Sequence, residues 1–279
     1  MFKSQIAKPG LPEPRRWKTR LRHQMRWFFW RMRFCLLFSL KNKKRTLIPD
    51  RKLQTLGVAA VGMGQRYADW CCTMITSLRE AGDFDGPVYV ITDKPDLFAH
   101  FSNVQIIHVP SSRHRLIAKQ CKPWAINMVT QRDGLYLDSD LVITSPVRQW
   151  IDDVVPKTRD YSLLCFPDSK PCPGAFHGGV VYINTERARP LVKRWGQAIG
   201  TGRWGSDQAC LYSVSDDDGP SHMPARGFIF LRTLMRYEHW DVPCIVHVGN
   251  GLMRDLSKDV LYAYMRDKLH VTRMPAVSD

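Results

Sequence analysis

Short apolar runs alternate with amphipathic segments from residue 53 onward, and this alternation limits the chain to a small set of folds. Residues 65–82 and 117–129 carry apolar side chains at helical spacing. Around and between them lie the apolar runs at 53–61, 87–92, 104–109 and 135–137. Strands that alternate with helices predict a parallel α/β sheet. The chain has 279 residues and 44% hydrophobic content, which suits one such domain over residues 51–279.

The second half of the chain continues the pattern. Thr185 is expected to cap a helix, and Pro123 is expected in the first turn of the earlier helix, because an interior proline removes a hydrogen bond. The segment 167–174 is so rich in proline that it predicts a loop. Further strands are expected at 161–166, 180–183 and 244–248, and further helices at 185–199, 207–214 and 256–268.

Most of the positive charge lies at the N-terminus. The formal net charge is +15, and residues 1–50 hold 14 Lys or Arg against Glu13 and Asp50, so this segment alone carries +12. The remainder of the chain is nearly neutral. A nucleic-acid partner, which would need a basic face on the folded domain, is therefore not expected.

Residues 15–45 combine arginines with apolar and aromatic side chains at three- and four-residue intervals, which predicts a basic amphipathic helix. Arg26, Arg31 and Arg33 interrupt the apolar stretch, so it is too short for a membrane span or a signal peptide. Lying on an anionic membrane surface fits its composition. The alternatives are a helix packed on the body of the protein and a disordered basic arm.

Eight cysteines are scattered without a CxxC pair or a zinc-like spacing. Reduced, buried thiols in a cytosolic protein are the simplest interpretation. Together with the basic segment, this predicts a cytoplasmic protein, peripheral on the cytoplasmic face of a membrane.

The strongest chemical signal is Asp138-Ser139-Asp140, which follows the apolar run at 135–137. Ligands of open α/β sheets bind at the carboxyl ends of strands. A turn at Ser139 would let both carboxylates face one hard cation, and two neighbouring acids are costly without such a cation. The sequence therefore predicts a divalent metal site here.

Other polar residues lie where elements begin or end. His247 follows an apolar run and precedes a glycine-rich turn, so it could complete the metal site or be merely structural. Asp207-Gln208 opens a short helix, where it could bind sugar hydroxyls, or where Ser206 or Asp207 could simply be an N-cap. Lys119 and Lys122 lie at the start of the helix before the Asp-x-Asp strand, where a cation could steady a diphosphate, although either could equally be solvent-exposed.

Taken together, these residues resemble glycosyltransferase family 8, the glycogenin and galactosyltransferase group of GT-A enzymes. The segment 135–142, Leu-Tyr-Leu-Asp-Ser-Asp-Leu-Val, is similar to the central motif of that family. Pro167-Asp168, the segment 176–180 and Asp207-Gln208 resemble later family motifs in the same order, over about residues 55–250. His177-Gly178 stands where the family has Asn-Ser, and Met253 stands where it has a lysine.

The resemblance implies a single GT-A domain with a mixed central sheet and transfer from a nucleotide-diphosphate sugar with retention of configuration. It implies Mn²⁺ or Mg²⁺ as the metal and a glycan, glycolipid or protein as the acceptor. Asp207 and Gln208 would be the catalytic residues, and the metal ligands would be Asp138, Asp140 and His247. The nucleotide-sugar would be bound by Val61, Tyr67, Lys122, Asp138, Asp168, His177 and Gly179.

Two other functions remain open from the sequence. A haloacid dehalogenase-type phosphatase also has an Asp-x-Asp after a strand, although its motif normally follows the first strand of the domain. Alternatively, the chain is a non-catalytic protein of the membrane surface, with residues 1–50 as its functional part.

Overall fold

The computed structural model describes Met25, residues 55–111, 115–168, 175–215, 219–235 and 244–249, and six residues between 252 and 264. The predicted amphipathic helix at 15–45 lies almost wholly outside these residues, as does most of the helix expected at 256–268. Within the described part of the chain, no helix is long and apolar enough to cross a membrane.

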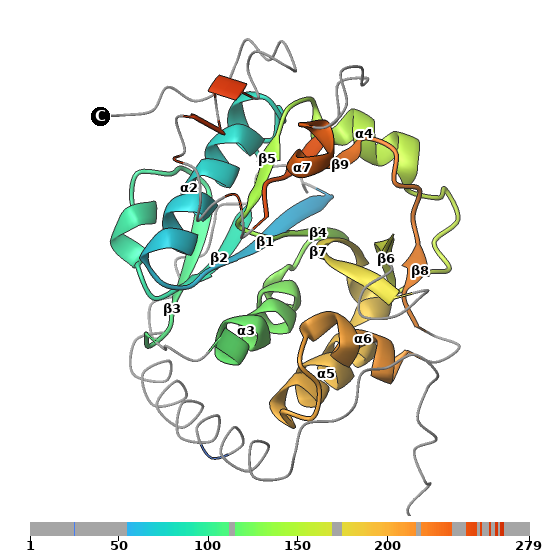
Figure 1. Ribbon diagram of the computed structural model, residues 1–279. Helices are drawn as coiled ribbons and strands as arrows, with labels where there is room; N and C mark the ends of the chain where they lie inside the picture. Colours follow the sequence, from blue (N-terminus) through green and yellow to red (C-terminus); the bar gives the residue numbers. More distant parts are fainter. Residues whose placement is uncertain are drawn as a thin grey trace, which may run out of the picture.

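A seven-stranded mixed sheet forms the centre of the molecule, in the order β3-β2-β1-β4-β7-β6-β8 (Figure 1). The first four strands along the chain are mutually parallel, β7 runs antiparallel to β4 and β6, and β8 is parallel to β6. The strands are β1 (Leu56–Gly62), β2 (Val88–Thr92), β3 (Val104–His108), β4 (Asp133–Leu137), β6 (Leu163–Asp168), β7 (Ala175–Asn184) and β8 (Ser221–His222).

Helices cover both faces of this sheet, which explains why β1 and β4 are buried at consecutive positions. Alternate residues of β1 point to opposite faces, so Ala59 belongs to one core cluster and Val58 to another. The first cluster lies under α3 (Arg115–Met128), α5 (Thr185–Gly200) and α6 (Asp207–Val214), and the second lies under α2 (Gln65–Glu80). Figure 1 shows α3, α5 and α6 together on one side of the sheet.

A second, three-stranded sheet packs beside α2, with the order β5-β10-β9. Its strands are β5 (Leu141–Ile143), β9 (Phe228–Phe230) and β10 (Ile245–His247). Three short helical segments, η1 (Pro95–Phe98), α4 (Val147–Val154) and α7 (Leu231–Leu234), complete the described elements. The small sheet lies on the opposite side of β4 from α3 and α6 (Figure 1).

Most elements expected from apolar spacing are confirmed, and three details are wrong. Pro123 lies inside α3 rather than in its first turn. Gly196 of α5 faces Pro123 where α3 and α5 meet. The two helices therefore pack closely at the point where Pro123 removes a backbone hydrogen bond from α3. Thr185 is the first residue of α5, after Asn184 at the N-cap. Pro167 and Asp168 extend β6 and pair with β7, so the loop begins later than expected.

The six described cysteines are free thiols. Five of them are buried, and Cys72 is partly exposed. Burial raises the pKa of the Cys165 thiol to about 12, so this thiol stays protonated and unreactive at neutral pH.

Candidate active site

The strand order changes direction at β4: β1, β2 and β3 lie on one side of it in the sheet, and β7, β6 and β8 lie on the other. The polar residues of the site gather at the carboxyl end of β4. β4 ends at Leu137, and the amide of Asp138 donates a hydrogen bond to the carbonyl oxygen of Gly179 on β7, at 2.8 Å. β7 begins at Ala175, so its first residues, including His177 and Gly179, extend beyond the end of β4. Open α/β sheets bind their ligands at such a point.

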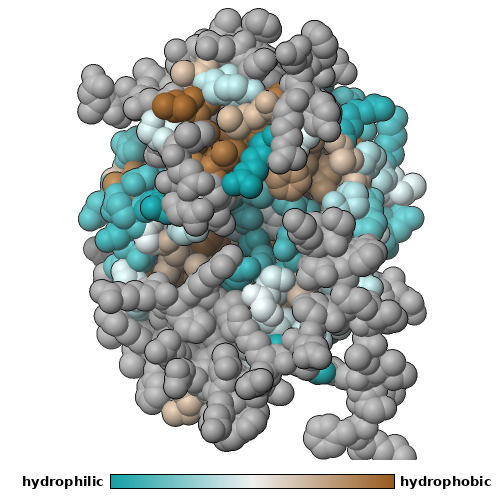
Figure 2. All heavy atoms as spheres, in the orientation of Figure 1, coloured by the Kyte–Doolittle hydropathy of each residue, from teal (hydrophilic) through white to brown (hydrophobic). Residues whose placement is uncertain are grey.

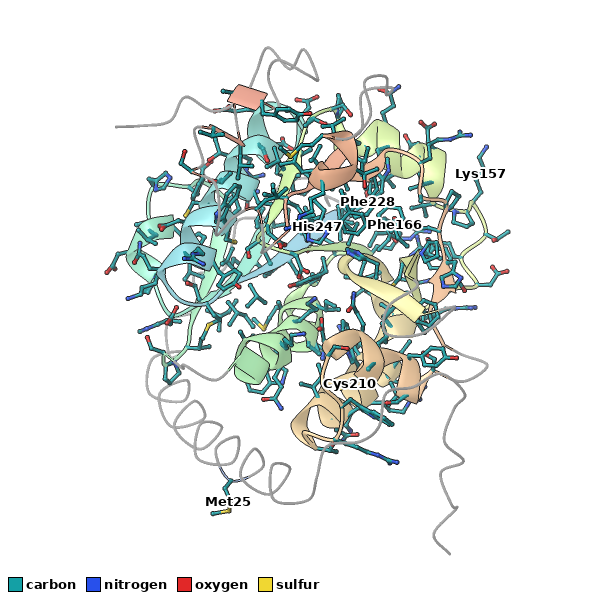
Figure 3. The ribbon with its side chains drawn as sticks, viewed as in Figure 1. Met25, Lys157, Phe166, Cys210, Phe228 and His247 are labelled. Carbon is teal, nitrogen blue, oxygen red and sulfur yellow. The ribbon has the colours of Figure 1, made fainter. Side chains whose placement is uncertain are left out.

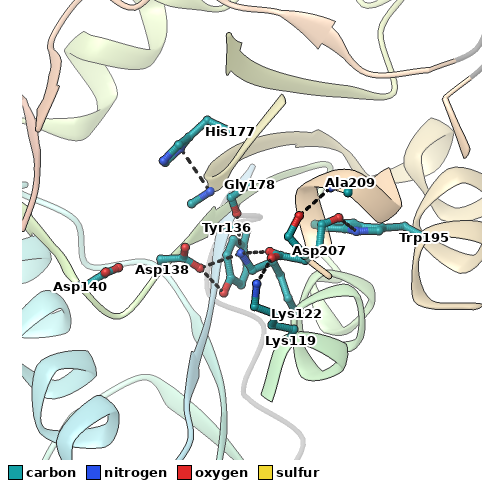
Figure 4. Close-up of polar contacts among 12 residues, drawn as sticks. Lys119, Lys122, Tyr136, Asp138, Asp140, His177, Gly178, Trp195, Asp207 and Ala209 are labelled. Atoms are coloured by element: carbon teal, nitrogen blue, oxygen red, sulfur yellow. Dashed lines mark hydrogen bonds and ion pairs between the residues drawn. The ribbon is translucent and has the colours of Figure 1, made fainter. Parts of the chain in front are cut away.

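A chain of alternating charges lies at this edge. Lys122 Nζ on α3 is 3.0 Å from Asp138 Oδ1 and 2.7 Å from Asp207 Oδ2 on α6. Lys119 Nζ, one turn earlier on α3, is 2.7 Å from Asp207 Oδ1. Figure 4 shows the two lysines, Asp207 and Asp138 converging on one point. We call Lys119, Lys122, Asp138 and Asp207 the charge cluster.

The charge cluster is tolerated in the interior because each buried ion has several partners. Lys122 also donates to the Gly178 carbonyl oxygen at 2.8 Å. Asp207 is 5% exposed, and Ser206 caps α6 through the Ala209 amide, which leaves the Asp207 carboxylate to the lysines. Of the two N-cap candidates, Ser206 is therefore confirmed and Asp207 is wrong. Burial alone would raise the pKa of Asp207, but Lys122 and Lys119 hold it well below its usual value.

Asp138 differs from Asp207 because it faces the open side of the site. Its side chain is 27% exposed, and Oδ1 accepts a hydrogen bond from the Tyr136 hydroxyl at 2.8 Å. Burial raises the pKa of Asp138 above its usual value, Lys122 opposes that effect, and Asp140 adds to it. A carboxylate in this position gains stability when further positive charge arrives.

The Asp140 carboxylate contacts the small sheet, whereas the Asp138 carboxylate contacts Lys122. His247 Nε2 at the end of β10 is 3.2 Å from Asp140 Oδ2. Burial alone would lower the pKa of His247, but the Asp140 carboxylate raises it above its usual value. Nδ1 of His247 is buried without a hydrogen-bond partner. His247 thus lies beside the acidic motif, where its predicted role as a metal ligand would require it to be.

The donor set fits a divalent ion in kind: two carboxylates and one imidazole with an unpartnered buried nitrogen are ligands that Mn²⁺ accepts. In the described part of the chain, no three His, Cys, Asp or Glu side chains converge closely enough to form a metal site as they stand. Asp140 and His247 already meet, whereas Asp138 is turned toward Lys122 and Tyr136. Binding by all three would require Asp138 to turn.

His177 stands beside the charge cluster as a neutral imidazole. Its Nδ1 accepts a hydrogen bond from the Gly179 amide at 3.3 Å, and its side chain is buried. Burial, together with the nearby charges of His247 and Lys122, lowers the pKa of His177 to about 3. A Cβ on Gly179 would lie 2.7 Å from His177 Cε1 and 3.0 Å from Asp138 Oδ2, so only glycine fits between these side chains.

The other residues predicted to bind the nucleotide-sugar surround this edge. Tyr67 is exposed in the first turn of α2, directly after the end of β1. Val61 is buried in the core near the end of β1, so only its backbone could face a ligand. Asp168 is the last residue of β6, and its side chain lies outside the described part of the structure. Gln208 is partly exposed, and its Cγ lies 3.6 Å from a Cβ built on Gly178.

Tyr136 is a site residue that the sequence did not single out. Its ring is 1% exposed, and Lys122 Nζ lies 5.1 Å from the ring centroid. The signal was available, because Tyr136 precedes Asp138 by two residues and alternate residues of a strand share a face. Tyr136 thus positions Asp138 through its hydroxyl and Lys122 through its ring.

No family model matches the sequence, and no curated protein matches it. Among solved structures, the chain is similar to the galactosyltransferase LgtC in complex with donor and acceptor sugar analogs, with a TM-score of 0.53 and 16% identity over 79% of this chain and 97% of that one. A second structure, of an active-site mutant of LgtC, gives a TM-score of 0.52 and 15% identity, with the same coverage. The expected likeness to GT-A glycosyltransferases is confirmed at the level of the fold: the chain has the mixed α/β GT-A fold of these galactosyltransferases.

Proposed function

We propose that this chain is a metal-dependent glycosyltransferase that moves a sugar from a nucleotide-diphosphate sugar to a glycan, lipid or protein acceptor. One observation carries the proposal: the charge cluster and the Asp140–His247 pair lie together at the carboxyl edge of a GT-A sheet. The LgtC neighbour was solved with donor and acceptor sugar analogs, which supports the same two classes of ligand here.

The diphosphate would lie between Lys122 and the acidic motif. Asp138, Asp140 and His247 would hold Mn²⁺ or Mg²⁺, which would act as a Lewis acid on the leaving nucleoside diphosphate. Lys122 would place its ammonium group against the same phosphates, and its three donors allow it to keep one contact with the Asp207 carboxylate. The turn of Asp138 toward the metal would free Lys122 for this role.

The transferred sugar would lie against α6. Asp207 is held ionised by two lysines, so it accepts hydrogen bonds from sugar hydroxyls and does not act as a proton donor. Its negative charge would also stabilise the positive charge that develops at the anomeric carbon as the bond to phosphate breaks. Gln208, beside it, can both donate and accept hydrogen bonds to the same sugar.

The remaining predicted residues complete the donor site. Tyr67 would stack on the nucleotide base, and the backbone of Val61 would border it. Gly179 leaves room for Asp138 and His177 to approach each other, and His177 would contact the sugar as a neutral imidazole. Asp168, at the end of the neighbouring strand β6, would accept a hydrogen bond from a sugar hydroxyl.

A direct test measures hydrolysis of a panel of nucleotide-sugars with and without Mn²⁺. We expect Mn²⁺-dependent hydrolysis of at least one donor and its loss in Asp140→Ala. Asp152→Ala is the matched control, since Asp152 is exposed on α4, and we expect it to keep the activity. Equal rates in Asp140→Ala and the control would refute the metal role.

We further propose that residues 15–45 bind the protein to the cytoplasmic face of an anionic membrane. This rests on their arginine-rich, aromatic composition. The test is co-sedimentation of the full chain with vesicles of phosphatidylcholine alone or with phosphatidylserine. Binding that requires the anionic lipid and falls with salt is expected, and no binding to either vesicle would reject the idea.

A further inference from the structure

Phe230, the last residue of β9, carries an aromatic ring that is 44% exposed. Three other rings pack against it: His247 at 5.0 Å, Phe228 at 5.3 Å and His177 at 5.5 Å between centroids. Phe228 in turn stacks on Phe166 at 4.4 Å. Figure 3 shows Phe166, Phe228 and His247 beside one another between the two sheets. The ring of Phe230 is therefore held by its neighbours while much of its surface faces solvent.

This exposed ring lies next to the donor site. His247 connects it to Asp140 through the 3.2 Å contact, and His177 connects it to Gly179 and so to Asp138. An apolar ring bordered by two imidazoles and carboxylates has the mixed character of a small-molecule site, in which apolar surface gives affinity and a few polar groups give orientation.

The charged groups for a diphosphate lie on the other side of the motif. Lys119, Lys122 and Asp207 belong to α3 and α6, whereas Phe230 belongs to the small sheet across β4 (Figure 1). Hydrophobic residues gather in the upper part of the view in Figure 2, over the region where Figure 1 draws α2, β5 and α7, next to hydrophilic residues at the centre. Phe230 itself carries no charge that would hold phosphate.

We infer that Phe230 is the platform of a sugar subsite next to the donor site, and that the acceptor sugar rests there with its C–H face on the ring. This inference rests on the proposed function, because only transfer requires an acceptor site beside the donor site, and it narrows the acceptor to one that carries a sugar. Pyranose rings offer an apolar C–H face and hydroxyl edges. The aromatic ring of Phe230 matches the face, and the imidazoles of His177 and His247, which pack against this ring, hold it in place.

The test uses the full chain and ligand-observed saturation-transfer NMR with three probes: methyl β-D-glucoside, methyl β-D-galactoside and cyclohexanol. Cyclohexanol offers a similar ring with a single hydroxyl group. We expect at least one glycoside to receive saturation at its ring C–H protons, and cyclohexanol to receive much less. Equal saturation of cyclohexanol, or none of either glycoside, would overturn the inference.

Three variants locate the binding. Phe230→Ala and Phe230→Leu should weaken glycoside binding roughly tenfold, because both remove the aromatic face, and Phe230→Leu keeps an apolar side chain if the alanine variant folds poorly. Phe230→Trp should bind as well as the wild type. Met235→Ala, which removes another exposed apolar side chain after α7, is the control and should bind normally. Unchanged affinity in Phe230→Leu would refute the platform.

Nucleotide-sugar hydrolysis by the wild type separates the two proposals. If hydrolysis occurs and glycoside binding does not depend on Phe230, the acceptor platform is wrong and the proposed function stands. If glycoside binding depends on Phe230 but no nucleotide-sugar is hydrolysed or bound, the proposed function is wrong and the acceptor role falls with it.

Discussion

Replacing Lys122 by Met should destabilise the protein more than any other single change in the charge cluster. Met keeps the packing of the aliphatic stem and removes the ammonium group, which contacts Asp207 at 2.7 Å, Asp138 at 3.0 Å and the Gly178 carbonyl oxygen at 2.8 Å. Each ion pair at this distance is worth about 6 kcal/mol at an effective dielectric constant of about 20, before desolvation is subtracted.

The net cost is smaller because burying the lysine already costs several kcal/mol. Removing one partner of a buried pair typically costs about 3–5 kcal/mol, since the other charge stays buried without compensation. Lys122 is 6% exposed, so we expect a loss near the middle of this range. The side chain of Lys119 is 21% exposed and, among the described residues, pairs only with Asp207, so Lys119→Met should cost only about 1–2 kcal/mol.

Urea unfolding of a double-mutant cycle measures the interaction directly. Lys122→Met leaves the Asp207 carboxylate with one lysine partner, Lys119, in place of two, and Asp207→Asn removes that carboxylate. The double mutant should therefore be more stable than the sum of the single losses predicts, by about 2 kcal/mol. A coupling within about 0.5 kcal/mol of zero, or a Lys122→Met variant no less stable than Lys119→Met, would refute the reasoning.

Four further outcomes are expected. Gly179→Ala should weaken nucleotide-sugar binding about tenfold in calorimetry, because its Cβ would meet His177 and Asp138, whereas Gly205→Ala, with nothing within 4 Å, should bind normally; equal affinities would contradict the close fit. Asp207 has a folded pKa below its unfolded value, so its stabilisation is present above a pH of about 4 and is lost as the pH falls; in urea unfolding at neutral and acid pH, Asp207→Asn should lose less stability on acidification than the wild type, and parallel losses would contradict this sign. Because the pKa of His177 is about 3, its imidazole should show no NMR titration between about pH 5 and 8; a midpoint near 6.5 would show that it is not buried as described. In thermal shift, a nucleotide-sugar at a hundred times its dissociation constant should add about 2.7 kcal/mol of stability, and only with Mn²⁺ present; the same shift in EDTA would exclude metal dependence.

The parts of the fold that depend on local pattern could be predicted from the sequence. The long apolar runs of β1 and β2 and the helical spacing of α2 each lie within one short segment, so periodicity alone identifies them. The position of Asp138 at the end of β4 follows from the apolar run before it. The small sheet was harder to predict from the sequence, because strands of three residues, such as β5 and β9, are too short to show a periodic pattern.

The contacts that make the site could not be predicted in the same way. Lys119 and Asp207 are 88 residues apart in sequence and meet only because α3 and α6 cover the same face of the sheet. Ile143 and Ile245 pair across β5 and β10, and this pairing brings His247 to Asp140. Such contacts depend on the strand order, which local spacing does not determine. The positions of Asp207 at a helix start and His247 at a strand end mark both residues as candidates, and the resemblance to a known family implies their roles, but neither predicts these contacts.

If the proposed function holds, the charges of the site imply that the nucleotide-sugar would need a cation to bind, even though two lysines are present. Among the described residues at this edge, Asp138 and Asp207 pair with Lys119 and Lys122, and Asp140 pairs with His247, so the positive charge of the two lysines is already neutralised. A diphosphate alone would therefore approach a site with no net positive charge. A divalent ion would make the net charge of the site positive. It would also stabilise the ionised form of Asp138, whose pKa is raised by burial. With the metal neutralising Asp138, the Lys122 ammonium group could move from the Asp138 carboxylate to a phosphate, and both Asp138 and Lys122 would keep a partner of opposite charge. Metal and diphosphate are therefore expected to bind together.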